Sequence, residues 1–282
     1  MTKKENDLAY YSFKAYETEP AKGMLGLGSG EFMVDTSLCE RPMNATGYDC
    51  FSVHWTDGHY SVGQEPIISD FETWRQQLRV PNLDHVNWEP TYRSIQNVDR
   101  ANTLVCATLM IGPFERTTTL TSYEDCLVNC ISEPEEYSAL IGVLADHRIA
   151  TIHKIYEIAQ PDIFIIHDDW GSNQATLISP ELWRQTIKPH IKRIYDACKE
   201  HGAIIVQHSC GRVGVLVPDM IEMGANVWEA QVDCNDIDAL RAEYGNQIRI
   251  RTNVVGDDTA ELPPPPTGAE VTPYAEPPVF LY

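Results

Sequence analysis

The strongest constraint on the fold is an alternation that begins near residue 100. From there to about residue 254, apolar β-rich runs alternate with amphipathic helical stretches. The predicted strands lie at 103–111, 162–169, 203–211, 226–231 and 248–254. The predicted helices lie at about 133–159, 179–201, 214–223 and 236–244. Strands that are nearly all apolar are buried on both faces, which favours parallel pairing in an α/β fold with a (β/α) barrel as the leading candidate.

The helix predicted over 179–201 has the clearest ends. Ser179 is a natural N-cap, Pro180 suits the first helical turn, and Gly202 is typical of a C-terminal stop. A buried stripe repeats at steps of three or four residues and consists of Trp183, Ile187, Ile191, Ile194 and Cys198. This stretch is therefore predicted to be one helix with one face packed on the sheet.

The first hundred residues have little sustained periodicity. They are rich in Gly, Pro, Trp and Tyr, which indicates irregular structure, a few short strands and a helix near 70–78. The glycine-rich stretch 26–30 lacks both a preceding strand and a following Lys-Ser/Thr, so it is interpreted as a turn and not as a phosphate loop. Cys126 and Cys130 are interpreted as buried small apolar side chains.

The amino-acid composition limits the kinds of molecule that the protein is expected to bind. The 282 residues carry a formal net charge of −20, from 41 Asp and Glu against 21 Lys and Arg. So large an acidic surplus repels polyphosphate backbones, and with no local basic patch it argues against nucleic acid or anionic membranes as partners. No apolar run approaches the roughly 18 residues of a membrane span, and no signal peptide is recognisable, so we expect a cytoplasmic protein. Eight irregularly spaced cysteines favour reduced thiols over a disulfide framework.

Polar and titratable side chains gather where three successive predicted strands end. The carboxyl ends of parallel strands meet at one rim of a barrel, where the chemistry of such folds lies. A purely structural sheet has little reason to place titratable groups there. In chain order these side chains are His167, Asp168, Asp169, Trp170, His208, Cys210, Glu229 and Gln231.

His208 and Cys210 can reach one metal ion, because side chains two residues apart on a strand point to the same face. Zinc takes imidazole and thiolate ligands, although a lone His-x-Cys is a weak signal and a packed histidine with a buried cysteine is the alternative. Asp168 and Asp169 are candidates for acid/base catalysis, with helix or loop capping an equally good interpretation. Glu229 and Cys234 are candidates for a third ligand, and Glu229 also for a base, without diagnostic spacing.

The stretches "HDDWGSNQATLISPELWRQTIKPHIKRIYDACKEHG", "HSCGRVGVLVPDMIEMGANVWEAQ" and "DIDALRAEYGNQIRI" resemble the uroporphyrinogen decarboxylase superfamily, from about Gly112 to Ile250. This superfamily joins the decarboxylase to corrinoid-linked methyltransferases. The resemblance implies an α/β fold of the (β/α)8 TIM-barrel type. From their places at the strand ends, we expect Asp168, Asp169 and Glu229 to be catalytic residues and His167, Trp170 and Gln231 to bind substrate.

Two motifs distinguish the branches of the superfamily. True decarboxylases carry an arginine-rich motif near the N-terminus that holds the porphyrinogen carboxylates, and Arg41 is the only arginine among residues 1–60. The methyltransferases bind zinc through a His-x-Cys pair and a distant cysteine, and His208 and Cys210 match that pair. The resemblance therefore favours a methyltransferase with zinc at His208 and Cys210. A corrinoid (cobalamin) on a partner protein would take or give the methyl group of a small-molecule donor or acceptor.

The C-terminus departs from the family pattern. After residue 254 the chain continues as "VGDDTAELPPPPTGAEVTPYAEPPVFLY", where four consecutive prolines stop both helix and central strand. We therefore expect an irregular N-terminal part at 1–100, a barrel core with the site at 101–254, and an atypical Pro-rich tail at 255–282 that leaves the barrel truncated and without the family's third zinc cysteine. Uroporphyrinogen decarboxylation and an inactive binding subunit remain the alternative functions. The resemblance also leaves a homodimer open.

Overall fold

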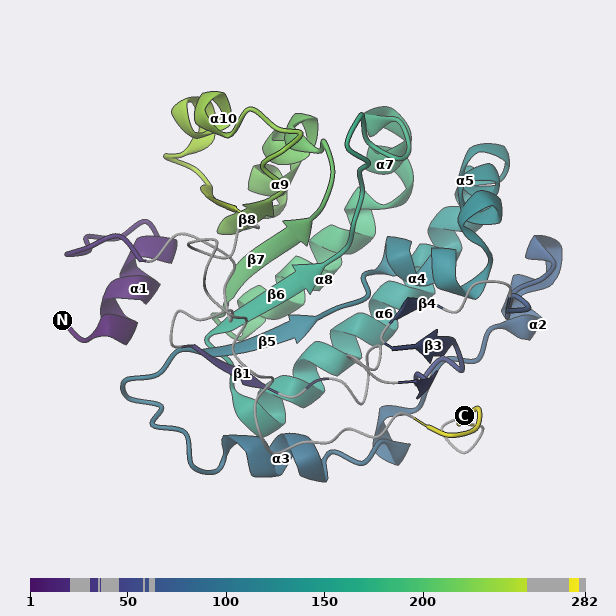
Figure 1. Ribbon diagram of the computed structural model, residues 1–282, viewed down its shortest axis with the longest axis horizontal. Helices are drawn as coiled ribbons and strands as arrows, with labels where there is room; N and C mark the ends of the chain where they lie inside the picture. Colours follow the sequence, from purple (N-terminus) through teal and green to yellow (C-terminus); the bar gives the residue numbers. More distant parts are fainter. Residues whose placement is uncertain are drawn as a thin grey trace.

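A six-stranded parallel sheet organises the protein in the computed structural model (Figure 1). The structure describes residues 1–20, 31–34, 36, 46–57, 59–60, 64–252 and 274–278. The sheet has the strand order β1-β5-β6-β7-β8-β9, and every pair is parallel. Its strands are β1 (Phe32–Val34), β5 (Val105–Leu109), β6 (Ile163–His167), β7 (Ile204–Ser209), β8 (Val227–Ala230) and β9 (Arg249–Thr252). From β5 onward, neighbours in the sheet are also successive in the chain, which is the β/α order that the alternation predicts.

Helices fill the connections between these strands. They are α4 (Pro113–Leu120), α5 (Tyr123–Ser132), α6 (Pro134–Ala159), α7 (Pro180–Thr186), α8 (Lys188–Glu200), α9 (Val217–Met223) and α10 (Ile237–Tyr244). Apart from the helix predicted over 179–201, the predicted strands and helices of this region are confirmed, with ends that differ by a few residues. No helix in the described part of the chain is long and apolar enough to span a membrane.

The helix predicted over 179–201 is wrong in one respect, because it is broken at Ile187 into α7 and α8. Pro189 occupies the first turn of α8, and a proline has no N–H to continue the hydrogen bonding of the preceding helix. The predicted N-cap is confirmed, since the Ser179 hydroxyl accepts a hydrogen bond from the Leu182 N–H at 3.2 Å. The predicted apolar stripe is confirmed as well, and Gly202 follows with a left-handed φ of 70°.

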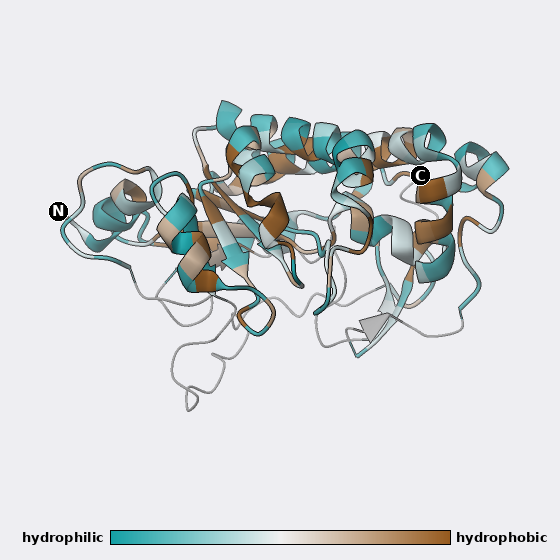
Figure 2. Ribbon diagram, turned by 90° about the horizontal axis from the view of Figure 1, so that it is seen from above, coloured by the Kyte–Doolittle hydropathy of each residue, from teal (hydrophilic) through white to brown (hydrophobic). Residues whose placement is uncertain are grey.

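Buried apolar side chains line both faces of the sheet. The ribbon in Figure 2, coloured by hydropathy, shows that the central strands are largely hydrophobic. Phe164, Ile166 and Ile205 point to the face that α6 and α8 cover. Ile163, Ile165 and Val206 point to the opposite, inner face. There they pack with Tyr11, the last residue of α1 (Lys3–Tyr11), so the N-terminal helix covers the apolar part of the inner face.

The N-terminal region adds irregular structure around the sheet, as predicted. Its elements are β2 (Gly47–Tyr48), β3 (His54–Thr56), β4 (His59–Tyr60), η2 (Phe71–Thr73), α2 (Trp74–Gln77), η3 (Leu83–His85) and α3 (Glu89–Ile95). Cys126 and Cys130 are buried, as predicted. The stretch 26–30 lies outside the described residues, and so does the Pro-rich tail apart from 274–278, where Tyr274 bridges to Tyr48.

Candidate functional site

Four polar side chains form a row across the inner face of the sheet. The strand register places His167 of β6 opposite His208 of β7, His208 opposite Glu229 of β8, and Glu229 opposite Arg251 of β9. His208, Glu229 and Arg251 are buried. Two residues earlier on β7 and β8 the inner face is apolar, so the row marks the point at which the sheet interior becomes polar. The polar side chains that the sequence places at the ends of β6, β7 and β8 thus lie side by side.

His208 is the centre of this group. Its Nδ1 atom lies 3.4 Å from Glu229 Oε2. On the other side of the ring, Nε2 lies 3.4 Å from Cys210 Sγ and 3.8 Å from Asp169 Oδ1. Burial lowers the pKa of His208, but the Cys210 and Glu229 side chains outweigh burial and raise the pKa to about 9. The two ring nitrogens therefore face different groups, a carboxylate at Nδ1 and a thiol with a second carboxylate at Nε2.

His167 repeats part of this arrangement. Its ring stacks on that of His208, with centroids 4.4 Å apart and planes 10° from parallel. Its Nδ1 lies 2.9 Å from Oε2 of Glu115, a residue of α4. Each imidazole therefore has a carboxylate at Nδ1. Pairing a histidine with a carboxylate in this way fixes the orientation of the ring and is typical of histidines that bind metals.

Asp169 completes the group. Its Oδ1 atom accepts a hydrogen bond of 2.6 Å from the Cys210 N–H, which ties the end of β6 to the end of β7. Asp169, His167 and His208 each offer one ligand atom, and these three atoms lie within 4.8 Å of one another.

Asp168, the other predicted catalytic carboxylate, points elsewhere. Its carboxylate accepts hydrogen bonds from the backbone N–H groups of Phe114 and Glu115, at the start of α4, and from the Trp170 indole. Burial, and then the charge of Glu115, raise its pKa to about 7. A Cβ on Gly112 would lie 2.2 Å from the Asp168 side chain, so this approach requires glycine. The geometry favours the capping interpretation of Asp168 that the sequence left open.

The remaining predicted residues frame the site. Trp170 is buried against Trp183, so its ring is part of the core and offers almost no surface to a substrate. Gln231 connects two rim loops, because its amide oxygen accepts from the Gly211 N–H at 2.8 Å and its amide nitrogen donates to Asn173 at 2.9 Å.

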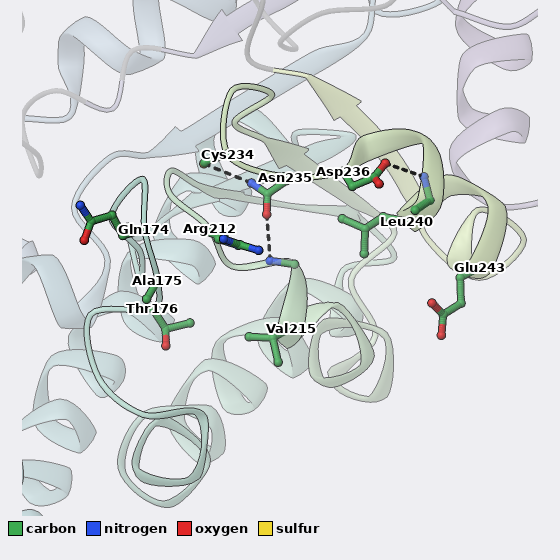
Figure 3. Close-up of a pocket in the computed structure, with 12 residues that line it drawn as sticks. Gln174, Ala175, Thr176, Arg212, Val215, Cys234, Asn235, Asp236, Leu240 and Glu243 are labelled. Carbon is green, nitrogen blue, oxygen red and sulfur yellow. Dashed lines mark hydrogen bonds between the residues drawn. The ribbon is translucent and has the colours of Figure 1, made fainter.

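Cys234 lies in a groove of about 450 Å³ outside these loops (Figure 3). The groove is bounded by the rim loops and α10, and Gln174, Arg212, Val215 and Leu240 contribute to its lining. The Cys234 thiol accepts a hydrogen bond of 3.5 Å from the Asn235 side chain. Among the described residues, the group of three side chains close enough together to hold a metal is His167, Asp169 and His208, and it includes neither Cys210 nor Cys234.

Sequence reasoning missed two residues of the site. Glu115 lies on a helix 52 positions before His167, and nothing in its local sequence distinguishes it from a surface acid. Arg251 was detectable, because a charged side chain inside a parallel strand needs a buried partner. Arg251 donates a hydrogen bond to the Tyr11 hydroxyl, which links the polar row to α1.

The donor set fits zinc. Zn–N distances of 2.0–2.1 Å and a Zn–S distance of 2.3 Å in tetrahedral geometry separate the two ligand atoms by about 3.6 Å. The His208 Nε2 and Cys210 Sγ atoms are 3.4 Å apart. The side chains are thus already spaced as a shared ion requires, and Glu229 holds the opposite nitrogen of His208.

Consecutive parallel β/α units with a polar, histidine-rich rim define a protein of the TIM-barrel type with its site at the carboxyl ends of the strands. The family model "Uroporphyrinogen decarboxylase (URO-D)" matches residues 49–257. The chain belongs to this family.

Thirteen chains of solved structures also match. One is a methyltransferase from Methanosarcina mazei, with a TM-score of 0.59 and 17% sequence identity over 79% of this chain. The match spans 64% of that chain, so this protein corresponds to less than two thirds of that methyltransferase. A search of the curated proteins finds no match.

Proposed function

We propose that this protein is a zinc-dependent methyltransferase of the uroporphyrinogen decarboxylase superfamily. It moves a methyl group between a small methylated substrate or acceptor and a corrinoid carried by a partner protein. One observation carries the proposal: the imidazole of His208 and the thiol of Cys210 are 3.4 Å apart at the rim of the barrel, on the side of the ring that Glu229 does not occupy.

Two further observations support this proposal over decarboxylation. His208 and Cys210 offer one nitrogen and one sulfur ligand, which suit a soft divalent metal, whereas decarboxylation of a porphyrinogen depends on cationic groups that hold carboxylates. Arg251, the cation of the polar row, is buried between Glu229 and Tyr11. The structural likeness to a methyltransferase from Methanosarcina mazei is consistent with the same branch.

The residues of this chain would act as follows. His208 and Cys210 would hold zinc, which as a Lewis acid lowers the pKa of a bound thiol or polarises the heteroatom that carries the methyl group. Glu229, 3.4 Å from Nδ1 of His208, would favour the proton on that nitrogen and leave Nε2, which faces Cys210, to bind the ion. Asp169 fixes the Cys210 backbone through its 2.6 Å hydrogen bond. The nearly complete burial of His208 and Glu229 excludes water from the ring.

The test is the zinc content of the purified protein beside the His208→Ala/Cys210→Ala double variant. We expect about one zinc per chain in the parent protein, almost none in the variant, and demethylation of methylcobalamin by simple thiols only with the parent. Absence of zinc from both proteins would overturn the proposal. Release of CO2 from uroporphyrinogen by the zinc-free protein would point to the decarboxylase instead.

A further inference from the structure

The groove outside the rim loops takes no part in the proposed metal site. Its volume of about 450 Å³ lies within the roughly 300–1,000 Å³ typical of small-molecule sites. It is built from the loops that follow β6, β7 and β8, at the end of the sheet where proteins of the TIM-barrel type bind ligands (Figure 3). We propose that this groove binds a small monocarboxylate with an apolar chain, held through Arg212. The inference goes beyond the proposed function, because the groove shares no side chain with the proposed zinc ligands.

Arg212 provides the positive charge that such a ligand needs. Most lysines and arginines in the described part of the chain form a hydrogen bond or an ion pair, and the exceptions are Lys14, Arg79 and Arg212. Of these three, Arg212 is the one that lines the groove. Its side chain is exposed in a protein with a formal net charge of −20. A guanidinium can bind a carboxylate through two parallel N–H donors, so Arg212 is suited to an anionic group from outside the chain.

The side chains around Arg212 suit a ligand with a polar end and an apolar body. The Gln174 amide and the Thr176 hydroxyl line the same groove and have no side-chain hydrogen bond with other described residues, so both can donate to a carboxylate. Val215, which is 54% exposed, and Leu240 add apolar surface to the lining. An apolar chain that covers these two side chains is removed from water together with them, which favours binding.

Hydrogen bonds between the three loops hold the groove in shape. The Arg212 N–H donates to the Ser172 carbonyl at 2.8 Å, which joins the loop after β7 to the loop after β6. The Asn235 side chain joins the loop after β8 to the loop after β7, because it donates to the Gly211 carbonyl at 2.9 Å and accepts from the Gly214 N–H at 3.1 Å. A groove whose walls are fixed before the ligand arrives loses less conformational entropy on binding.

The acidic residues of the groove limit the charge of the ligand. Asp236 caps α10, since its carboxylate accepts a hydrogen bond of 3.1 Å from the Ala239 N–H. Glu243 lies farther along this helix and away from Arg212 in Figure 3. One guanidinium beside two carboxylates can compensate a single negative charge, whereas these carboxylates would repel a dianion more strongly. The groove therefore favours a singly charged carboxylate over a phosphate.

The experiment titrates the nitrogen-15-labelled protein with hexanoate and follows the backbone amide resonances. Hexanoate should shift the resonances of amides in the groove, such as that of Gly214, and the shifts should saturate. Four further probes separate the charge from the chain: acetate lacks the chain, hexanol lacks the charge, hexylamine reverses the charge and hexyl phosphate doubles it. We expect acetate, hexanol and hexylamine to bind at least about 10-fold more weakly than hexanoate. Tighter binding of hexyl phosphate than of hexanoate would overturn the assignment to a carboxylate.

Arg212→Gln should weaken hexanoate binding by about 10-fold or more, because it removes the charge and the paired N–H donors. Arg79→Gln is the matched control, since it also removes an exposed arginine without a hydrogen bond or ion pair among the described residues, and its affinity should equal that of the parent. The His208→Ala/Cys210→Ala variant should bind hexanoate as the parent does, and loss of binding there would place the ligand at the metal site instead. Equal affinity of Arg212→Gln and the parent, or shifts that spread over the surface without saturating, would also overturn the inference.

Discussion

Two groups of polar side chains, each built around a buried charged or titratable residue, differ in how closely they are packed. The Asp49 cluster consists of Asp49, Arg116 and the Trp55 indole, and the strand-end cluster consists of His208, Glu229, Cys210, Asp169 and His167. Asp49 receives four hydrogen bonds, from the backbone N–H groups of Phe51 and Val53, from Trp55 and from Arg116, all at 3.0 Å or less. His208 is about as deeply buried, but its three polar neighbours lie 3.4–3.8 Å away.

Burial alone therefore does not distinguish a structural charge from a functional one. In the Asp49 cluster each carboxylate oxygen accepts two donors, which uses the hydrogen-bonding capacity of the group and fixes the loop at 49–55. In the strand-end cluster, Asp169 and Cys210 approach Nε2 of His208 at 3.8 Å and 3.4 Å, and Glu229 approaches the opposite edge of the ring at 3.4 Å. The polar neighbours of His208 thus lie farther away than those of Asp49, and Nε2 is the ring nitrogen at which an ion would bind.

The largest effect that tests this comparison is on stability. Asp49→Ala should lower the free energy of unfolding by about 3–5 kcal/mol, because it removes the buried carboxylate of the ion pair with Arg116. Urea-induced unfolding, followed by tryptophan fluorescence, measures the loss. Zinc content per folded chain should not change. The control is Glu89→Ala, which removes an exposed ion pair with Arg93 and should cost less than about 1 kcal/mol. A comparable small cost for Asp49→Ala would show that tight packing does not mark a structural charge.

The next effect concerns the strand-end cluster. Glu229→Gln keeps the shape of the side chain but removes the charge beside His208 Nδ1. Because Glu229 contacts the ligand His208 and not the ion, this substitution should weaken zinc binding by about 10–100-fold. Competition with a chelator measures the loss. A loss above 1000-fold would instead identify Glu229 as a direct ligand. A negligible loss would mean that the 3.4 Å contact has no role in orienting the imidazole.

A third test uses pH. The pKa of His147, a buried histidine near the Asp49 cluster, is lowered, whereas the pKa of His208 is raised. Burial, and then the positive charges of Arg148 and Arg116, lower the pKa of His147 to about 3. The unfolded chain binds this proton near pH 6.5, so the stability contributed by neutral His147 is present above pH 6.5 and is lost as pH falls toward 3.

Between pH 7 and pH 5 the titration of His147 should therefore lower the free energy of unfolding of the parent protein by about 2 kcal/mol. His147→Gln, which has no proton to gain, should lose less stability over the same interval. The difference between the two proteins isolates this histidine from the carboxylates that also titrate there. Equal losses would show that His147 is not held neutral.

Much of this architecture was predictable, since parallel strands that end at one rim must bring His167, His208 and Glu229 together once the alternation defines the strands. The sequence did not predict which of Asp168 and Asp169 would cap α4 and which would approach His208. Adjacent residues after a strand point to different sides, so which carboxylate caps α4 and which meets His208 depends on where β6 ends. The break at Ile187 had a sequence signal, Pro189, which the strong apolar stripe outweighed in the prediction.

The smallest effect is expected at Cys234, which the sequence offers as a third zinc ligand. Its thiol meets Asn235 in the outer groove, and Asn235 also donates to the Gly211 and Gln231 carbonyls, which anchors this loop to the rim. Moving Cys234 to the metal would disrupt those hydrogen bonds, each worth about 1 kcal/mol. Cys234→Ser should therefore leave zinc affinity, and the absorption spectrum after cobalt(II) replaces zinc, within about twofold of the parent. Loss of thiolate-to-cobalt absorption in this variant would place a second sulfur on the ion and show that the rim loop closes over the strand-end cluster when the metal binds.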